Sequence, residues 1–167
     1  MNISAADIKE LREKTGAGVM DCKKALTEAG GDQAKATAIL RERGLSMAER
    51  KAHRSTEQGL VECYIHAGGR IGAMVEVNCE TDFVARTDDF RALARDLAMQ
   101  VAATGPLVVS KDELSPNTEG PVEETCLLNQ PYIRDPSRTV QDIVNDVIAK
   151  TGENVRVRRF ARFELGN

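Results

Sequence analysis

The chain has 167 residues, a length that suits one ordinary domain or two small ones. Hydrophobic residues make up 41% and charged residues 29% of it, which excludes a disordered or collagen-like chain. A formal net charge of -3 argues against a protein that coats nucleic acid or binds anionic membranes. No apolar run approaches the roughly 20 residues of a membrane span, and the N-terminus shows no secretory signal. A soluble protein that is not exported is expected.

The cysteines and histidines predict no metal site and no bound cofactor. The four cysteines are Cys22, Cys63, Cys79 and Cys126. None of them forms a CxxC pair, and the two histidines are isolated in the sequence. In a protein that is not exported, these cysteines are expected to be free thiols.

Residues 1–45 predict three short helices separated by glycines. Ser4 and Asp7 have the spacing of a capping box at the start of the first helix. The second helix is expected to end at Gly30–Gly31, and the third to begin after Asp32 and to stop near Gly44. So small a helical unit is near the lower limit for a self-supporting core, which favours a recognition module over a catalytic one.

A β-hairpin is expected after a polar linker at residues 46–58. From residue 59 the apolar residues alternate with a period of two, and Gly68–Gly69 provide the turn. This turn places Cys63 opposite the region of Met74, so that a disulfide between Cys63 and Cys79 is out of register.

The rest of the chain predicts two helices, a connecting loop and a last strand. Apolar residues from Phe90 to Ala102 follow a helical spacing, as do those from Val140 to Ile148, and residues 110–126 read as a loop. The last strand is expected to place on one face Val155, Val157, Ala161, Phe163 and Leu165. Phe160 is expected on the opposite face, among arginines.

The fold class is therefore expected to be α+β, with a three-stranded antiparallel sheet packed against helices. Helices on one face of such a sheet leave its second face partly apolar. A partly apolar exposed face usually marks a subunit or partner interface.

Two functions other than protein recognition stay open on residue types alone. A thiol-dependent redox protein would need one cysteine with a depressed pKa. An RNA-binding protein could use the last strand, whose basic residues are Arg156, Arg158, Arg159 and Arg162. A solvated sheet face with acidic neighbours explains these arginines more simply. No nucleophile elbow or phosphate loop supports an enzyme.

The connection after the second predicted strand joins an acidic residue to an aromatic one, at Asp82 and Phe83. Connections carry function disproportionately, which makes Phe83 a candidate anchor for a partner. Composition alone favours the opposite interpretation, because large apolar side chains are usually buried in the core.

Three long motifs follow one another along the chain: LREKTGAGVMDCKKAL at 11–26, EVNCETDFVAR at 76–86 and GENVRVRRF at 152–160. Together they resemble the bacterial elongation factor Ts family, in a short form. The resemblance implies a UBA-like three-helix domain at 1–45, a linker at 46–58 and an α+β core at 59–167. It also implies that the central connection at 110–126 is shortened and lacks the projecting hairpin of longer members.

The resemblance further implies a cytoplasmic guanine nucleotide exchange factor for elongation factor Tu, which makes and breaks no bonds and needs no cofactor. The element that displaces magnesium from elongation factor Tu would be Thr81, Asp82, Phe83 and Val84, with Phe83 as the wedge. Val19 and Met20 would hold the GTPase. Short family members pair their cores, so a homodimer that binds two partner molecules is expected, without contact to nucleic acid or membrane.

Overall fold

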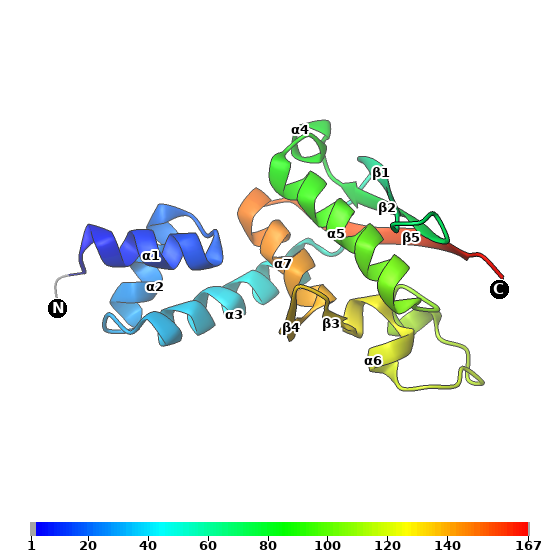
Figure 1. Cartoon of the computed structure of the whole chain (residues 1–167). Coiled ribbons are helices and arrows are strands. Elements are labelled where there is room, and N and C mark those ends of the chain that lie inside the picture. Colours follow the sequence, from blue (N-terminus) through cyan, green and yellow to red (C-terminus); the bar gives the residue numbers. More distant parts are fainter. Residues whose placement is uncertain (1–2, 167) are drawn as a thin grey trace. The chain divides into compact units, whose positions relative to one another are not determined.

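The computed structural model describes residues 3–166 and divides into two compact units (Figure 1). The first, here called the helical unit, holds the chain up to His53 together with Asn145–Glu153. The second, the sheet unit, holds Arg54–Val144 and the chain from Asn154 onward. Each unit is described separately below.

Three helices build the helical unit: α1 (Ala5–Thr15), α2 (Val19–Glu28) and α3 (Gln33–Lys51). The predicted capping box is confirmed, since the Asp7 amide donates to Ser4 Oγ and the Ser4 amide donates to the Asp7 carboxylate. Asp32 caps α3 as expected. The core consists of side chains without solvent exposure: Leu11, Cys22, Ala25, Leu26 and Ala36.

The prediction that the third helix stops near Gly44 is wrong. α3 continues through the buried Gly44 to Lys51, so that residues 46–51 of the expected linker are helical. One glycine inside a helix costs only about 1 kcal/mol relative to alanine. The good helix formers that follow, among them Leu45, Met47 and Ala48, are enough to carry the helix past it.

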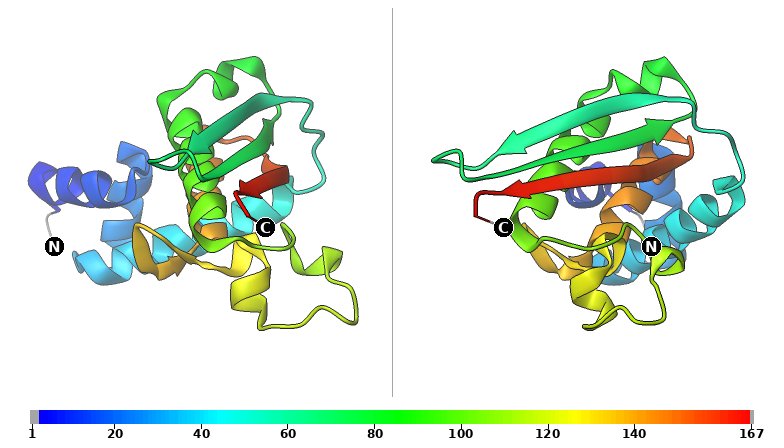
Figure 2. Two further views of the ribbon diagram at one scale, coloured as in Figure 1. Left: turned by 45° about the vertical axis from the view of Figure 1, so that its right-hand side comes forward. Right: turned by 90° about the vertical axis from the view of Figure 1, so that its right-hand side faces the viewer.

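The sheet unit confirms the expected α+β fold. Its antiparallel sheet has the strand order β1 (Gln58–Ile65), β2 (Ile71–Cys79) and β5 (Val155–Glu164). Cys63 lies opposite Met74 as predicted, and Gly68 and Gly69 form the turn with φ of +89° and +68°. α5 (Asp88–Thr104) packs across one face of this sheet (Figure 2).

Short elements complete the sheet unit. α4 (Asp82–Ala85) joins β2 to α5, and the chain returns through η1 (Lys111–Glu113), α6 (Val122–Thr125), η2 (Leu127–Asn129), β3 (Pro131–Tyr132) and β4 (Asp135–Thr139). α7 (Val140–Thr151) follows, and from Asn145 onward it belongs to the helical unit. The expected loop at 110–126 therefore contains two helical turns. A buried amide, Gln100 on α5, bonds to Gln130, Pro131 and Ile133 and fastens this return segment to the helix.

The predicted faces of the last strand are wrong beyond its middle, because β5 contains a bulge. Val157 pairs with Val77 but Arg159 pairs with Glu76, which leaves Arg158 as the extra residue. One extra residue reverses the alternation that follows it. Phe160 consequently lies opposite the buried Val75, on the same side of the sheet as the first half of the strand.

Beyond the bulge, the side chains of Ala161 and Phe163 lie on the outer face, which is the sheet face opposite α5. Ala161 lies opposite Met74 and Phe163 opposite Gly72, next to Cys63 and Ile65 of β1. The large apolar side chains exposed here are Val61, Ile65, Met74 and Phe163. An open groove of about 410 Å³ runs over this part of the sheet. The predicted apolar character of the second face is thus confirmed.

Candidate functional site

Thr81, Asp82, Phe83 and Val84 form a single turn between β2 and α5. Thr81 is the N-cap residue of α4, and its Oγ1 accepts a hydrogen bond from the Val84 amide at 3.4 Å. Thr and Asp at these positions favour a helix start, because their side chains accept from free amides or face the positive end of the helix. The structure thus brings these four predicted site residues together in one local element.

Phe83 is 80% exposed, whereas the adjacent Val84 and Ala85 are buried. The composition-based interpretation of Phe83 as a core residue is therefore wrong. The turn directs its two smaller apolar residues inward and its aromatic ring outward. A phenylalanine ring displayed in this way leaves most of its apolar surface in water, and its burial by a partner would be favourable by about 1.5–3 kcal/mol.

Asp82 projects from the same turn and forms an ion pair with Arg86 at 2.9 Å. Both side chains are substantially exposed, at 47% for Asp82 and 74% for Arg86. An exposed pair four residues apart contributes well under 1 kcal/mol. The Asp82 carboxylate can therefore leave Arg86 and make another contact at little cost in free energy.

The C-terminal end of the turn is tied to the long helix by Thr87. Its Oγ1 donates to the Val84 carbonyl oxygen at 2.8 Å and accepts from the Phe90 amide at 3.3 Å. Thr87 is the N-cap residue of α5, so one side chain ends α4 and begins α5. Since Phe90 is fully buried under the sheet, the turn is fixed to the core at this end.

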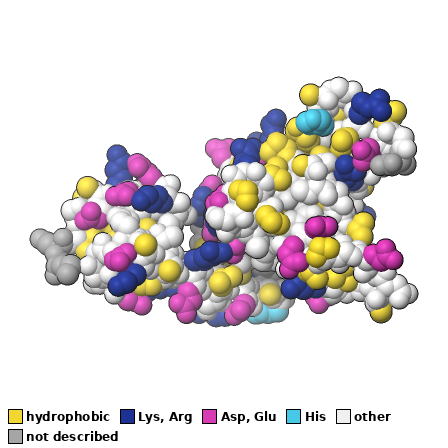
Figure 3. All heavy atoms as spheres, turned by 60° about the horizontal axis from the view of Figure 1, so that its bottom comes forward, with side chains coloured by type: hydrophobic (Ala, Val, Ile, Leu, Met, Phe, Trp, Pro, Cys, Tyr) yellow, Lys and Arg dark blue, Asp and Glu magenta, His cyan; other side chains and the backbone are white. Residues whose placement is uncertain are grey.

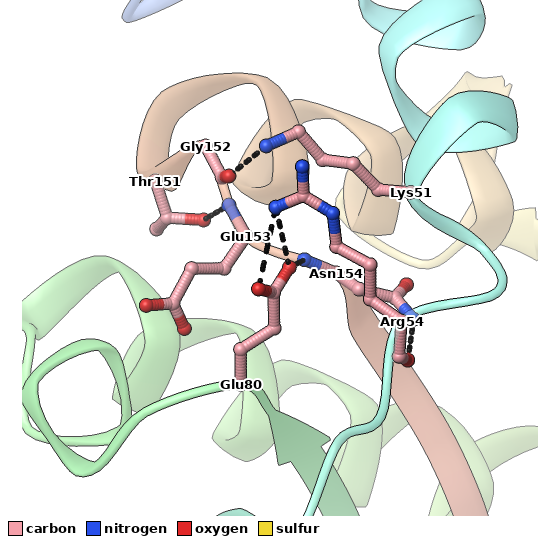
Figure 4. A network of polar contacts seen from close by, with 7 residues as sticks. All are labelled: Lys51, Arg54, Glu80, Thr151, Gly152, Glu153 and Asn154. Carbon is pink, nitrogen blue, oxygen red and sulfur yellow. Dashed lines mark hydrogen bonds and ion pairs between the residues drawn. The ribbon is translucent and has the colours of Figure 1, made fainter.

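A polar network supports the residue that precedes the turn (Figure 4). The Glu80 carboxylate accepts from the Asn154 backbone amide at 2.6 Å and pairs with Arg54 at 3.4 Å. The Asn154 side chain in turn donates to the Arg54 carbonyl oxygen at 2.9 Å. Sequence reasoning did not predict this network, because its three residues lie far apart in the chain and only the fold brings them together.

Figure 4 also shows two contacts within the helical unit. Lys51 Nζ donates to the Gly152 carbonyl oxygen, and the Glu153 amide donates to Thr151 Oγ1 at 3.3 Å. The Lys51 bond joins the end of α3 to the residue after α7, whereas the Glu153 bond stays within residues 151–153. The Lys51 bond is thus one link between two segments of this unit that are distant in sequence.

Val19 and Met20 form the first turn of α2, in the helical unit. They are 50% and 61% exposed, while Cys22 and Leu26 on the other side of the helix are buried. The structure therefore displays both predicted contact residues side by side on the surface of one unit, and displays Phe83 on the other.

The thiols do not favour a redox function. All four are free, and only Cys63 is exposed. Burial raises the pKa of the Cys22 thiol, the opposite of what a reactive thiolate requires.

The arginines of β5 are largely matched by acidic neighbours. Arg158 and Arg159 both contact Glu76, at 3.6 Å and 2.7 Å, and Arg162 pairs with Glu164 at 2.7 Å. The Arg159 hydrogen bond lowers the pKa of Glu76, which keeps this carboxylate charged. Across the face of the molecule drawn in Figure 3, positive and negative side chains are interspersed. These observations favour the solvated-face interpretation over RNA binding.

Neither a metal-binding cluster nor a membrane-spanning helix is found within residues 3–166. No cluster of three or more His, Cys, Asp or Glu side chains there has the arrangement to hold a metal ion. None of the helices in that range has both the length and the apolar character to cross a membrane.

Comparisons with known proteins agree on one family. The family model described as elongation factor TS matches residues 5–119 and 118–167. Proteins named elongation factor Ts from Desulforamulus reducens, Heliobacterium modesticaldum and Caldanaerobacter subterraneus are each 50% identical to this chain. Each alignment covers 98% of this chain, and 89%, 90% and 97% of the respective relative. The alignments run over 194 positions, more than the 167 residues here, so the relatives contain residues that this chain lacks.

Proposed function

This chain belongs to the elongation factor Ts family and is thus a translation elongation factor; from that premise we propose that it is the guanine nucleotide exchange factor for elongation factor Tu. The observation that carries the proposal is the exposed Phe83 on a turn anchored to the core. A wedge must protrude and must also be held firmly, and α4 provides both properties.

In the proposed mechanism, Phe83 inserts between helices of the GTPase near its nucleotide site, with Asp82 and Thr81 alongside. Magnesium in a GTPase bridges the nucleotide phosphates to the protein. A wedge that displaces the magnesium removes much of the electrostatic attraction that retains GDP. GDP then dissociates faster, and GTP can bind in its place.

Val19 and Met20 are proposed to hold the GTPase domain while Phe83 acts. Their role is binding rather than displacement, since both side chains offer exposed apolar surface that a partner can cover. Truncation of an interface side chain that anchors binding costs more than about 1 kcal/mol of binding free energy, in contrast to most other interface residues.

Exchange by this route makes and breaks no covalent bond and needs no cofactor in this chain. Thermodynamic linkage requires that a factor which weakens GDP binding is itself bound more weakly when GDP is present. The complex of factor, GTPase and nucleotide is therefore transient. We propose that the protein acts in the cytoplasm and that neither nucleic acid nor membrane is a partner.

A homodimer formed through the outer sheet face is the second part of the proposal. Phe163, Met74 and Ile65 are exposed around an open groove there, and a second copy would cover them. Each copy would keep its own Phe83, so that the dimer binds two GTPase molecules. Sedimentation of the parent and of Phe163→Glu tests this: we expect a dimer for the parent and a monomer for the variant, and a monomeric parent would contradict it.

The exchange proposal is tested by stopped-flow release of fluorescent GDP from elongation factor Tu. Three samples are compared: no addition, the parent protein and its Phe83→Ala variant. Acceleration by the parent that is largely lost in a folded variant supports both the activity and the wedge. A folded parent that does not accelerate release contradicts the proposal.

A further inference from the structure

We propose that Cys79 is a positioning residue for nucleotide exchange: its buried thiol fixes the N-terminal end of α4 and thereby the direction in which Phe83 projects. This inference rests on the proposed function. Cys79 acts at the N-terminal end of α4, whereas Thr87 holds the C-terminal end.

The turn needs such an anchor because α4 has only four residues. Isolated helices shorter than about 12 residues are marginal in water, since each hydrogen bond must offset the entropy of fixing several dihedral angles. Phe83 adds little to the local packing, being 80% exposed, and the buried residues of the turn, Val84 and Ala85, lie at its C-terminal end. The orientation of its N-terminal end must therefore come from neighbouring residues that are themselves fixed.

Cys79 is such a residue, at the end of β2. Its side chain is fully buried, on the same inward face of the sheet as Val75 and Val77. Its backbone position is fixed by pairing on both sides, with Gln58 of β1 and Val155 of β5. A group held in this way can serve as a rigid reference for the residues that follow.

The Cys79 thiol donates a hydrogen bond to the Thr81 carbonyl oxygen, with Sγ 3.1 Å from the oxygen. The same oxygen accepts from the Ala85 amide at 3.3 Å, in the first backbone bond of α4. A carbonyl oxygen has two lone pairs and can accept both bonds. The thiol thus connects the end of the central strand directly to the N-cap peptide of the helix.

The direction of the Thr81 carbonyl sets the plane of the peptide between Thr81 and Asp82, which immediately precedes Phe83. A cysteine suits this position because it is buried easily, as a small apolar residue is, yet still carries a weak donor. Alanine would remove the donor and with it the bond between residue 79 and the Thr81 carbonyl oxygen. Serine would retain a donor in the same place.

Loss of the anchor should reduce the fraction of molecules whose Phe83 is ready to insert. If that fraction falls to a tenth, the step that needs it slows about tenfold. First contact with the GTPase through Val19 and Met20 does not require Phe83 to be in the orientation for insertion. The rate at saturation should therefore fall, while the concentration that gives half the maximal rate stays nearly unchanged.

The experiment measures GDP release against factor concentration for the parent and for Cys79→Ala, Cys79→Ser and Phe83→Ala. Cys126→Ala is the matched control, because Cys126 is equally buried in the same unit and its thiol contacts Thr125 rather than a residue of α4. Thermal unfolding of each variant checks folding. Should Cys79→Ala not fold, Cys79→Val removes the donor while filling the space.

We expect Cys79→Ala to lower the saturated rate about tenfold, Cys79→Ser to restore most of it, and Cys126→Ala to stay within about twofold of the parent. A second readout needs no partner: hydrogen exchange of the Ala85 amide, followed by NMR, should accelerate in Cys79→Ala and not in Cys126→Ala.

A parent-like saturated rate in folded Cys79→Ala overturns the inference, as does an equal loss in Cys126→Ala. If the parent itself does not accelerate GDP release, the proposed function fails. Hydrogen exchange of the Ala85 amide then tests the anchoring by Cys79 independently. An unchanged hydrogen-exchange rate in Cys79→Ala would refute that anchoring.

Discussion

Two exposed apolar turns, α4 around Phe83 and the first turn of α2 around Met20, are held in different ways. α2 has ten residues, and its buried side fits the core of the helical unit through Cys22, Ala25 and Leu26. Met20 takes its direction from this regular helix. α4 has four residues, of which only Val84 and Ala85 are buried, and hydrogen bonds from Cys79 and Thr87 hold its two ends.

The difference separates two ways of presenting a contact residue. On α2, many side chains share the support, so the loss of any one surface residue changes only the contact that this residue makes. On α4, individual anchors set the geometry, so activity is sensitive to residues that a partner never touches. Such sensitivity is appropriate for a wedge, because a small misplacement near a reacting site can lower a rate substantially.

The largest effect is expected for Phe83→Ala. Truncation of a central anchor residue costs roughly 2–4 kcal/mol, so the saturated rate of GDP release should fall on the order of a hundredfold. The free energy of unfolding should change by less than about 0.5 kcal/mol, because the ring is exposed in the free protein. Stopped-flow kinetics and urea unfolding measure the two quantities. A large loss of stability would mean that Phe83 supports the fold rather than acting as a wedge.

Met20→Ala should produce the opposite kinetic pattern. The concentration for half-maximal stimulation is expected to rise about tenfold, with the saturated rate unchanged, since the residue is proposed to hold the GTPase and not to displace magnesium. Leu45→Ala is the control, a similarly exposed apolar side chain in the same unit. A fall in the saturated rate for Met20→Ala would break the distinction between the two turns.

Local rules predicted much of the fold from the sequence. The capping box of Ser4 and Asp7, the Asp32 cap and the paired register of Cys63 with Met74 all depend on residues close in sequence or on a two-residue turn. The elongation factor Ts motifs pointed to Phe83, whereas composition placed it in the core. Its exposure follows from the direction of a single turn, which neither periodicity nor composition determines.

The errors arose where one residue changed the pattern. A helix stop at Gly44 assumed that a glycine outweighs its neighbours, which it does not when good helix formers follow. The extra residue Arg158 reversed the faces of β5 and placed Phe163 on the outer face. The anchors of α4 were missed for a different reason, because a thiol bonded to a carbonyl two residues away leaves no sequence signal.

Thr87→Ala should have a smaller effect than Met20→Ala on exchange but a measurable one on stability. Loss of the N-cap side chain of α5 is expected to cost about 1 kcal/mol of unfolding free energy. Because the same hydroxyl bonds to the Val84 carbonyl, the saturated exchange rate should also fall, by about threefold. Thr87→Ser keeps the hydroxyl and should restore both. An unchanged rate beside the stability loss would show that Thr87 caps α5 without steering α4.

The smallest effect is expected for Ser4→Ala, at the start of α1 and outside both turns. Hydrogen bonds from the Ser4 side chain and amide lower the pKa of Asp7. A carboxyl group whose folded pKa is lowered stabilises the fold above its unfolded pKa of about 3.9, and this contribution disappears as the pH falls through the folded pKa. The parent should therefore melt a few degrees above Ser4→Ala at pH 7, and the difference should shrink towards pH 3.

The exchange kinetics at pH 7 should be the same for both proteins, because the cap supports neither Met20 nor Phe83. A slower exchange in Ser4→Ala would mean that the presentation of Met20 depends on the whole helical unit, and not on α2 alone.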